Sequence, residues 1–413
     1  MTTRREFLRN AAIAAGGTAL LGSHFMCGKG GQTAGKSRVV SVAAEDMLKG
    51  KRYNPEAVHR AFTAGLKEMT GENSLEKAWA SMFSPDDVVG VKINCLGAPK
   101  ISSSLETIHE TVAGLKSAGV KENNIIIWDR RDSEFRRTGL KVNKSTEGVR
   151  IHGTSTHRES TAVWVEGYDR NMYISLEDGT IKKYRELMTQ NFTEEGTHRD
   201  IFNSVAWLWM LIQQGNPKAQ KYSQEIRELY ADYSDREGAK RIAEEIADEF
   251  NDVTIEDEEK SFFSNIVTKG ITKLINIPVL KHNEDSGVTW AAKNIALGVT
   301  TNKIRFHIDY CTTAIPEILS HPCMKDKMVL HIGEAAKIST KSVLGAQLAF
   351  DNRLFFSADP VAMDRIGLDI LEEKRIEQKM EPIRDISTHI AACAKKGLGT
   401  DDLTMIDLRE LHV

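Results

Sequence analysis

The segment DVVGVKINCLGAPKISSSLETIHETVAGLKSAGVKENNIIIW, Asp87 to Trp128, decides the fold class. Its first part, DVVGVKIN, is rich in β-branched residues and predicts a buried strand over Asp87–Asn94. A helix is expected over Ser104–Ser117, because apolar residues recur there at helical spacing. The run NIIIW, Asn124–Trp128, predicts a second strand. This strand–helix–strand order indicates a right-handed parallel crossover.

Strands and helices continue to alternate along the chain, which predicts an α/β fold with a mostly parallel sheet and flanking helices. Asp359-Pro360 is typical of a helix start, because a capping residue precedes a first-turn proline. The pair Asp351-Asn352 between two apolar runs predicts a hairpin. Further strands are expected at 38–43, 273–279, 328–332, 345–350, 354–357 and, at an edge, 403–411, and further helices at 54–69, 288–296, 359–373 and 386–394.

The composition is that of an ordinary soluble globular chain. Of its 413 residues, 41% are hydrophobic and 27% are charged, and the net charge is −3. The length suits one large α/β domain or two. Because no basic stripe accompanies this near-neutral charge, nucleic acid is not an expected partner.

Residues 1–35 have the layout of a signal peptide, with a basic head, a short apolar run over Ala11–Leu21 and then small polar residues. The apolar run is too short to span a bilayer. Thr3 to Arg9, TRREFLR, is similar to the twin-arginine export motif. We therefore expect export to the periplasm or beyond, with the twin-arginine export machinery as a partner. The alternative is a basic N-terminal helix. A lipid anchor at Cys27 is disfavoured, because His24-Phe25-Met26 fits a lipobox poorly.

Residues 36–165 and 260–413 are predicted to form the two parts of one α/β core. A polar and mostly helical insertion at 166–259 separates them. The most apolar part of the insertion lies within 200–214 and reads AWLWMLI. We interpret it as the insertion's own small core, with a partner or oligomer contact as the alternative. The insertion as a whole would be a lid or a docking arm.

The cysteines give little indication of a cofactor. Beyond the signal segment, none of them belongs to a CxxC pair, so neither a zinc knuckle nor a ferredoxin-type cluster is expected. Cys311 and Cys323 could form a disulfide in an oxidising compartment. Isolated buried thiols are the alternative. The four cysteines are Cys95, Cys311, Cys323 and Cys393.

Polar side chains follow several of the predicted strands. In open α/β sheets, ligands bind beyond the carboxyl ends of the strands, so these side chains should gather at one crevice. For each single residue, the alternative is an ordinary solvated or ion-paired side chain. The residues are Lys92 and Asn94 after the first strand, Asp129, Arg130 and Asp132 after the second, and Lys281 and His282 after the strand at 273–279.

The helix expected at 288–296 would add Lys293 and Asn294 to the same crevice. Thr289 and Lys293 are four residues apart and would share one face of that helix. Lysines and a helix N-terminus suit an anion such as a phosphate or a carboxylate. The sequence therefore predicts a site for a small anionic ligand.

The predicted catalytic residues are His282, Asp129, Asp132 and Lys293. His282 is the expected general acid or base, because histidine titrates near neutrality. Asp129 and Asp132 would hold a cation or act as acid and base. A metal ion is compatible with these carboxylates, but the scattered histidines select no particular metal.

Four blocks of the sequence, 87–140, 148–159, 273–298 and 353–371, resemble the DUF362 domain family in its twin-arginine-exported branch. The family has no established general activity, and some of its members carry iron–sulfur clusters on cysteine-rich modules that these blocks lack. The long insertion and the sequence His331-Ile-Gly-Glu334 depart from the family pattern. The motif positions that the resemblance implies are Lys92, Asn94, Asp129, Arg130, Asp132, Lys281, His282, Lys293, Asn294, Asp359, Pro360 and Asp364.

These observations support two main hypotheses. In the first, the protein is an exported enzyme that acts on a small anionic or metal-associated ligand. In the second, it is a non-catalytic exported protein that holds a cofactor or partner in the same crevice and docks through the insertion. A structural protein whose polar cluster is only solvated charge is a third reading. The residues expected to line the crevice are Lys92, Asn94, Arg130, Lys281, Thr289 and Asn294.

Overall fold

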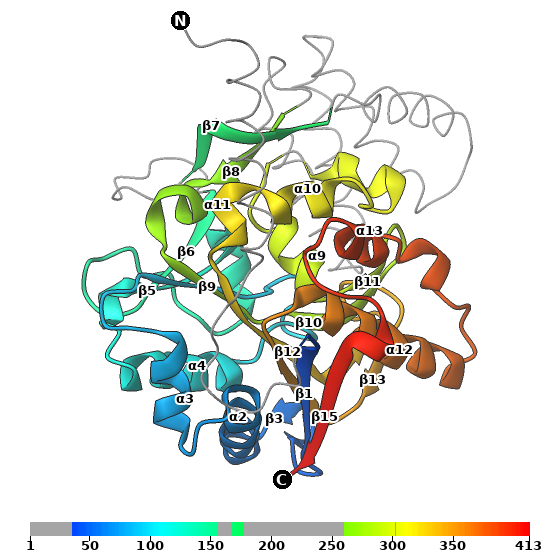
Figure 1. Ribbon diagram of the computed structural model, residues 1–413, viewed down its shortest axis with the longest axis horizontal. Coiled ribbons are helices and arrows are strands. Elements are labelled where there is room, and N and C mark those ends of the chain that lie inside the picture. Colours follow the sequence, from blue (N-terminus) through cyan, green and yellow to red (C-terminus); the bar gives the residue numbers. More distant parts are fainter. Residues whose placement is uncertain (1–34, 156–166, 177–259, 302) are drawn as a thin grey trace, which may run out of the picture.

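A computed structural model describes residues 35–155, 167–176, 260–301 and 303–413 of the protein. Within these residues the chain forms a central sheet of 11 strands with helices on both faces (Figure 1). The α/β fold expected from the sequence is confirmed. Along the sheet the strand order is β15 (Ile406–His412), β1 (Ser37–Ala43), β14 (Arg353–Ser357), β12 (Met328–Ser339), β9 (Lys273–Asn276), β4 (Val89–Lys92), β5 (Ile125–Arg131) and β6 (Arg150–Ser155).

The parallel part of the sheet contains the crossover predicted from the sequence. β12, β9, β4, β5 and β6 pair in parallel, and α4 (Leu105–Ser117) connects β4 to β5. The hydroxyl of Ser104 accepts the Thr107 N–H at 3.1 Å and so caps α4. β14 is antiparallel to both of its neighbours, and β15 lies parallel to β1 at the edge. The parallel strands therefore share one carboxyl edge.

The sheet separates two hydrophobic cores. Against one face pack α2 (Pro55–Thr70), α3 (Leu75–Met82) and α4. Against the other pack α9 (Ala291–Ala296), α10 (Ala314–Ser320), α12 (Pro360–Glu377) and α13 (His389–Lys395) (Figure 1). The remaining short elements are β2 (Leu48–Lys49), β3 (Arg52–Tyr53), α11 (Pro322–Lys325) and 3-10 or π turns at Glu122–Asn124, Asp132–Arg137, Ile266–Gly270, Ile304–Asp309, Arg384–Ile386 and Leu403–Met405.

The strand predicted at 273–279 is in fact two strands. β9 ends at Asn276, and β10 (Val279–Asn283) begins after Pro278, which has no N–H to donate to a ladder. β9 pairs with the first part of β12, whereas β10 pairs with the later part of β12 and with β11 (Gly287–Thr289). Lys281 and His282 therefore lie within a paired strand and not beyond a free strand end.

The helix predicted at 288–296 is shorter than expected. Thr289 belongs to β11, where it lies opposite Lys281, and α9 begins only at Ala291. The expectation that Thr289 and Lys293 share a helix face is therefore wrong. The β10–β11 turn takes up the residues that would have formed the first helical turn.

The hairpin predicted around Asp351-Asn352 is also wrong. β12, expected to end at Ile332, continues to Ser339. β13 (Leu348–Phe350) and β14 both pair antiparallel with β12, at successive positions along the same edge. The extra length of β12 offers backbone groups to both strands, so they do not pair with each other.

The start of the predicted insertion is β7 (Tyr168–Ser175), which pairs antiparallel with β8 (Lys260–Ser264), the first strand after the insertion. The first described part of the insertion is thus a strand and not a helix. Residues 177–259, with the apolar part at 200–214, lie outside the described residues, as do residues 1–34 with the export motif and Cys27. No helix in the described part of the chain is long and apolar enough to cross a membrane.

The four cysteines of the described residues are free thiols, and the disulfide considered between Cys311 and Cys323 is not formed. Cys311 is completely buried, whereas Cys323 is only partly covered. The alternative of isolated thiols is the correct one for this pair.

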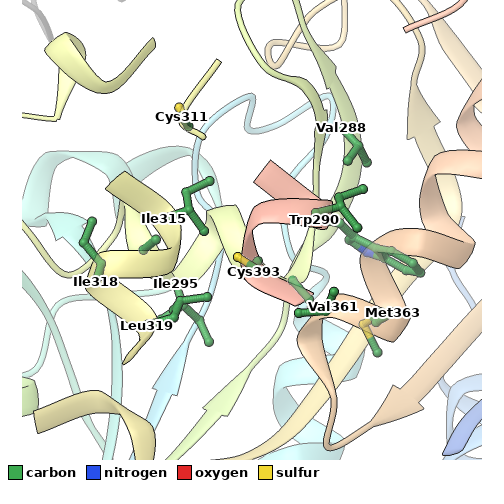
Figure 2. Packing of buried hydrophobic residues seen from close by; sticks show 14 of the residues in the cluster. Val288, Trp290, Ile295, Cys311, Ile315, Ile318, Leu319, Val361, Met363 and Cys393 are labelled. Carbon is green, nitrogen blue, oxygen red and sulfur yellow. The ribbon is translucent and has the colours of Figure 1, made fainter. Parts of the chain in front are cut away.

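Trp290 joins α9 to the sheet and to α12. Its indole is completely buried, meets Phe355 edge-on at a centroid distance of 5.2 Å and lies beside Met363 (Figure 2). Two glycines make room for it. A Cβ at Gly333 of β12 would come within 2.4 Å of the ring, and a Cβ at Gly367 of α12 within 2.2 Å. The position of α9 thus depends on the close approach of α12 to the indole.

We expect Gly367→Ala to lower the free energy of unfolding by about 1–3 kcal/mol, because the added methyl group overlaps the Trp290 ring. Urea unfolding measures the change. Glu373→Ala, at an exposed position of the same helix, is the control and should stay within about 0.5 kcal/mol of the wild type. A Gly367→Ala variant as stable as the control would contradict the close approach.

Candidate functional site

The carboxyl ends of β4 and β5 are joined by a buried ion pair. Lys92 Nζ lies 2.7 Å from Asp129 Oδ1, and the two side chains are 1% and 9% exposed. Asp129 also accepts the backbone N–H groups of Cys95 at 2.6 Å and Arg130 at 2.8 Å. Burial raises the pKa of Asp129, but the Lys92 ammonium and these hydrogen bonds outweigh burial and hold the pKa below its ordinary value. Both members of the pair are therefore charged.

Asp132 does not lie with Asp129 in one site. Its Oδ1 accepts the N–H of Gly153 at 2.6 Å, and its Oδ2 lies 2.6 Å from the ammonium of Lys144. The structure thus gives each aspartate its own cation and does not assemble the expected acid–base or cation-holding pair. In the described residues no group of three His, Cys, Asp or Glu side chains could hold a metal ion.

Arg130 is likewise held away from the other predicted ligand groups. Its Nε donates to Glu134 Oε1 at 2.8 Å, within the turn that follows β5. On the same turn, Asp132 lines a surface pocket of about 590 Å³ together with Arg136 and Lys141. The contacts of Arg130 and Asp132 are therefore made within and beside the turn that follows β5.

A chain of hydrogen bonds runs from Lys281 to His331. Lys281 Nζ donates to Asn94 Oδ1 at 2.6 Å, and Asn94 Nδ2 donates to Asn294 Oδ1 at 2.8 Å. Asn294 Nδ2 then donates to Asn276 Oδ1 at 2.7 Å, and Asn276 Nδ2 lies 3.1 Å from His331 Nδ1. Burial lowers the pKa of His331 to about 3, so this ring is neutral and its Nδ1 accepts. The structure thus brings together Asn94, Asn294 and Lys281, as the sequence predicted.

The bonds made by Lys281 identify it as a structural residue. Besides Asn94, its ammonium donates to the carbonyl oxygens of Leu96 and, at 3.3 Å, Val343. The side chain is completely buried. An ammonium has three N–H donors, and here three oxygens accept them. Lys281 therefore ties β10 to the loops after β4 and after β12, and its donors are already used.

The N-terminus of α9 is closed by the protein's own carboxylate. Asp364 of α12 accepts the N–H groups of Ala291 at 2.5 Å and Ala292 at 3.0 Å. The anion that we expected at this helix start is therefore Asp364 and not a ligand. Burial raises the pKa of Asp364 to about 7 despite these hydrogen bonds. His389 Nε2 lies 3.9 Å from it, but burial lowers the pKa of His389 to about 3, so the ring brings no charge.

Lys293 differs from the other two lysines in its bonding. Its side chain is 3% exposed, and its Nζ donates to Ser286 Oγ in the turn between β10 and β11. Among the described residues no carboxylate lies within ion-pair distance of it. Burial lowers the pKa of Lys293, although Cys311 and Asp285 act in the opposite direction. Burial also raises the pKa of the Cys311 thiol to about 11, so this neighbour stays uncharged.

His282 lies beside the same turn. Its Nδ1 is 2.9 Å from the Lys341 carbonyl oxygen, which can only accept, so Nδ1 carries the proton. Nε2 of the neutral ring is then the basic nitrogen. Burial lowers the pKa of His282, and Lys293 lowers it further. The hydroxyl of Thr289 is buried, and no hydrogen-bond partner faces it in the described residues.

Ser286 and Asn276 are site residues that the sequence analysis missed. Ser286 Oγ also donates to Asn283 Oδ1 at 2.8 Å, so the serine connects the turn to Lys293. A polar Asp-Ser-Gly turn predicts a change of direction but not where the hydroxyl points. Asn276 lies in an apolar strand. A single amide among apolar residues was the feature of the sequence that could have marked it as a site residue.

Comparison with known proteins agrees with the resemblance noted in the sequence. Residues 224–369 match the model of the DUF362 family, described as a domain of unknown function. The chain is thus similar to the DUF362 family over these residues. The matched range includes Lys281, His282, Lys293 and Asp364, and it does not include the β4 and β5 residues.

Other comparisons add little to this DUF362 assignment. No curated protein matches the chain. Among solved structures, it is similar to a crystal structure of a protein from Thermotoga maritima with a TM-score of 0.32 and 10% sequence identity. The alignment covers 81% of this chain and 61% of that one.

We expect Lys92→Met to lower the free energy of unfolding by about 3–5 kcal/mol, because it leaves the Asp129 carboxylate buried without its cation. The double variant Lys92→Met/Asp129→Asn should recover most of the loss, because the amide oxygen can still accept a backbone N–H. Urea unfolding of both variants measures this coupling. Lys116→Met, which removes an exposed ion pair, should change stability by about 1 kcal/mol or less. A double variant no more stable than Lys92→Met would contradict the argument.

Asp364 should make stability depend on pH. Its folded pKa of about 7 lies above the ordinary value of 3.8, so the folded state binds the proton more tightly than the unfolded state. The stabilisation is therefore complete below about pH 4 and is lost as the pH rises towards 7. Urea unfolding of the wild type and of Asp364→Asn across this range isolates the effect, because other groups titrate equally in both. A difference that does not change with pH would refute it.

Proposed function

We propose that this DUF362 protein is an exported enzyme that binds a small anionic ligand at Lys293, beneath the β10–β11 turn. One observation carries the proposal. Lys293 is a buried lysine with a single hydrogen-bond acceptor, Ser286 Oγ, and no carboxylate partner in the described residues. A buried ammonium with two unused donors is unfavourable, and an anionic ligand would satisfy it.

The other two candidate lysines support this choice by contrast. Lys92 is paired with Asp129, and Lys281 donates to three oxygens. A ligand could reach either ammonium only by displacing these internal partners. Lys92 and Lys281 therefore hold the ends of β4 and β10 in place, and Lys293 is left as the group that contacts the ligand.

The turn above Lys293 gives a short route to solvent. Ser286, which contacts the amine, follows the exposed residues Glu284 and Asp285. A small displacement of this turn would open the space around Lys293. The negative charges of the turn would repel an anion in solution. We therefore expect a ligand whose anionic group is compact enough to pass the turn and reach Lys293 in the interior.

His282 is the proposed general acid or base. Its basic Nε2 is available because Nδ1 is bound to the Lys341 carbonyl. Burial lowers the pKa of His282 and so favours the neutral ring, which suits a base. The free Thr289 hydroxyl is the proposed neutral ligand contact, whereas the amides of Asn94 and Asn294 are bound to each other, to Lys281 and to Asn276 and hold the site in place. Asp129 acts through Lys92, as a positioning residue for the β4 end.

Export by the twin-arginine route completes the proposal and is supported by the sequence of residues 3–9. That route carries chains that have already folded, so the ligand site would form before export. The non-catalytic alternative differs in one respect, since it predicts binding at Lys293 without turnover.

Isothermal titration calorimetry with inorganic phosphate and with citrate tests the site. We expect Lys293→Met to weaken binding roughly tenfold or more, because a charged hydrogen bond is lost. Lys395→Met, which removes an exposed lysine of α13, should bind as the wild type does. Circular dichroism should show both variants folded.

The same titrations should show proton uptake. Because burial lowers the pKa of Lys293 and the anion binds its ammonium form, affinity should fall as the pH rises above that lowered pKa. Calorimetry in two buffers of different ionisation enthalpy measures the uptake. Binding of neither anion by the wild type, or equal binding by Lys293→Met, would sink the proposal.

A further inference from the structure

The edge strand β15 presents an unpaired backbone. β15 spans Ile406–His412 and pairs, among the strands of the described residues, with β1 alone (Figure 1). Its outward-facing N–H and C=O groups have no protein partner in the described part of the chain. Natural edge strands are usually shortened, bent by bulges, interrupted by proline or protected by charged side chains, and of these devices β15 has only the charges of Asp407, Arg409 and Glu410. β15 has seven residues, no proline and a regular register with β1.

Apolar side chains are exposed along the same edge. Leu408 in the middle of β15 is 38% exposed, and Leu403 and Met405, just before the strand, are 48% and 41% exposed. A long edge strand with exposed apolar side chains is a site for pairing with another strand. Leu408 lies on the same strand face as buried Ile406. Its exposed side chain therefore borders the hydrophobic core at the edge of the sheet.

We propose that β15 is a dimerisation strand, at which the β15 of a second copy of this chain pairs antiparallel about a two-fold axis through Leu408. Most homo-oligomers are closed two-fold dimers, in which one patch must complement itself. An antiparallel pair of identical strands meets this condition if each residue finds a suitable partner across the axis. In this register the β15 sequence meets it at Leu408 and at the two flanking charge pairs.

The register about Leu408 matches side chains by type. Leu408 faces its own symmetry mate, and Asp407 lies opposite Arg409 of the second copy, so two opposite-charge pairs form. Within one chain Arg409 Nε already lies 2.9 Å from Asp407 Oδ1, so the two pairs would join into one network. The next pair outward sets Ile406 against Glu410 of the second copy, and the pair beyond it sets Met405 against the half-buried Leu411.

The neighbouring registers are unfavourable. A two-fold axis through Arg409 places two arginines face to face, and an axis through Asp407 places two aspartates face to face. A slip by a single residue is excluded, because residues directly opposite one another must point to the same face of the sheet. Like charges directly opposite one another destabilise a strand pair, so the sequence selects the register through Leu408.

Native mass measurement and directed cross-linking test the dimer. The purified wild type should have twice the 46.1 kDa mass of one chain by light scattering after gel filtration. Leu408→Asp and Arg409→Asp should each raise the dimer dissociation constant roughly tenfold or more, because each brings like charges together at the axis. Ile376→Asp, at a position 65% exposed on α12, should leave the mass unchanged. Circular dichroism checks that all three variants fold.

Cysteine cross-linking fixes the register. Directly opposed strand residues have Cβ atoms about 4.5–5.5 Å apart, so Leu408→Cys should form an intermolecular disulfide under mild oxidation. Ile376→Cys should not, and neither should the wild type, whose own thiols are buried or partly covered. A monomeric wild type, a dimer insensitive to Leu408→Asp and Arg409→Asp, or no disulfide at position 408 would each overturn the proposal. None of these results bears on anion binding at Lys293.

Discussion

The carboxylate of Asp364 at the start of α9 is the interaction on which the site depends. α9 has only six residues and could not hold its place without tertiary contacts. Asp364 satisfies its first N–H groups from α12, and the Trp290 indole fills the space between α12 and the sheet. Lys293 and Asn294 follow directly from that anchored first turn. The position of Lys293, the proposed ligand contact, is thus set by an aspartate on another helix.

The same device recurs at the other helix starts near the sheet. Glu334 of β12 accepts the N–H and hydroxyl of Ser104 at the start of α4, and Asp359 accepts the N–H groups of Val361 and Ala362 at the start of α12. Each carboxylate is buried or nearly so and is satisfied by helix dipole and backbone donors. Anionic side chains are therefore used for assembly in this fold. Lys92 and Lys281 are likewise bound by groups of the protein itself, and Lys293 is the exception.

The sequence predicted the parallel crossover, the helix starting at Asp359 and the edge strand near the C-terminus, because each follows from local periodicity and capping. It also placed Lys281, Asn94 and Asn294 together, although Lys281 lies within β10 and Asn294 on α9, and neither is at a strand end. It failed at Pro278, where one apolar run becomes two strands, and at 351–352, where a turn joins strands that pair with a third. The sequence also could not predict which ionic groups pair with each other. Whether Asp129 meets Asp132 or Lys92 depends on distances that only the assembled sheet sets.

The pairing of β1 with β15 brings residues near the two ends of the described chain side by side, with Ser37 opposite Ile406. Contacts of such long sequence separation form late and slow folding, because the whole intervening chain must first be ordered. β12 adds to this constraint, since its partners come from both earlier and later segments. The edge of the central sheet therefore cannot close until β15 has been synthesised. A quality-control step that recognises the closed edge would thereby check the described chain from its first strand to its last.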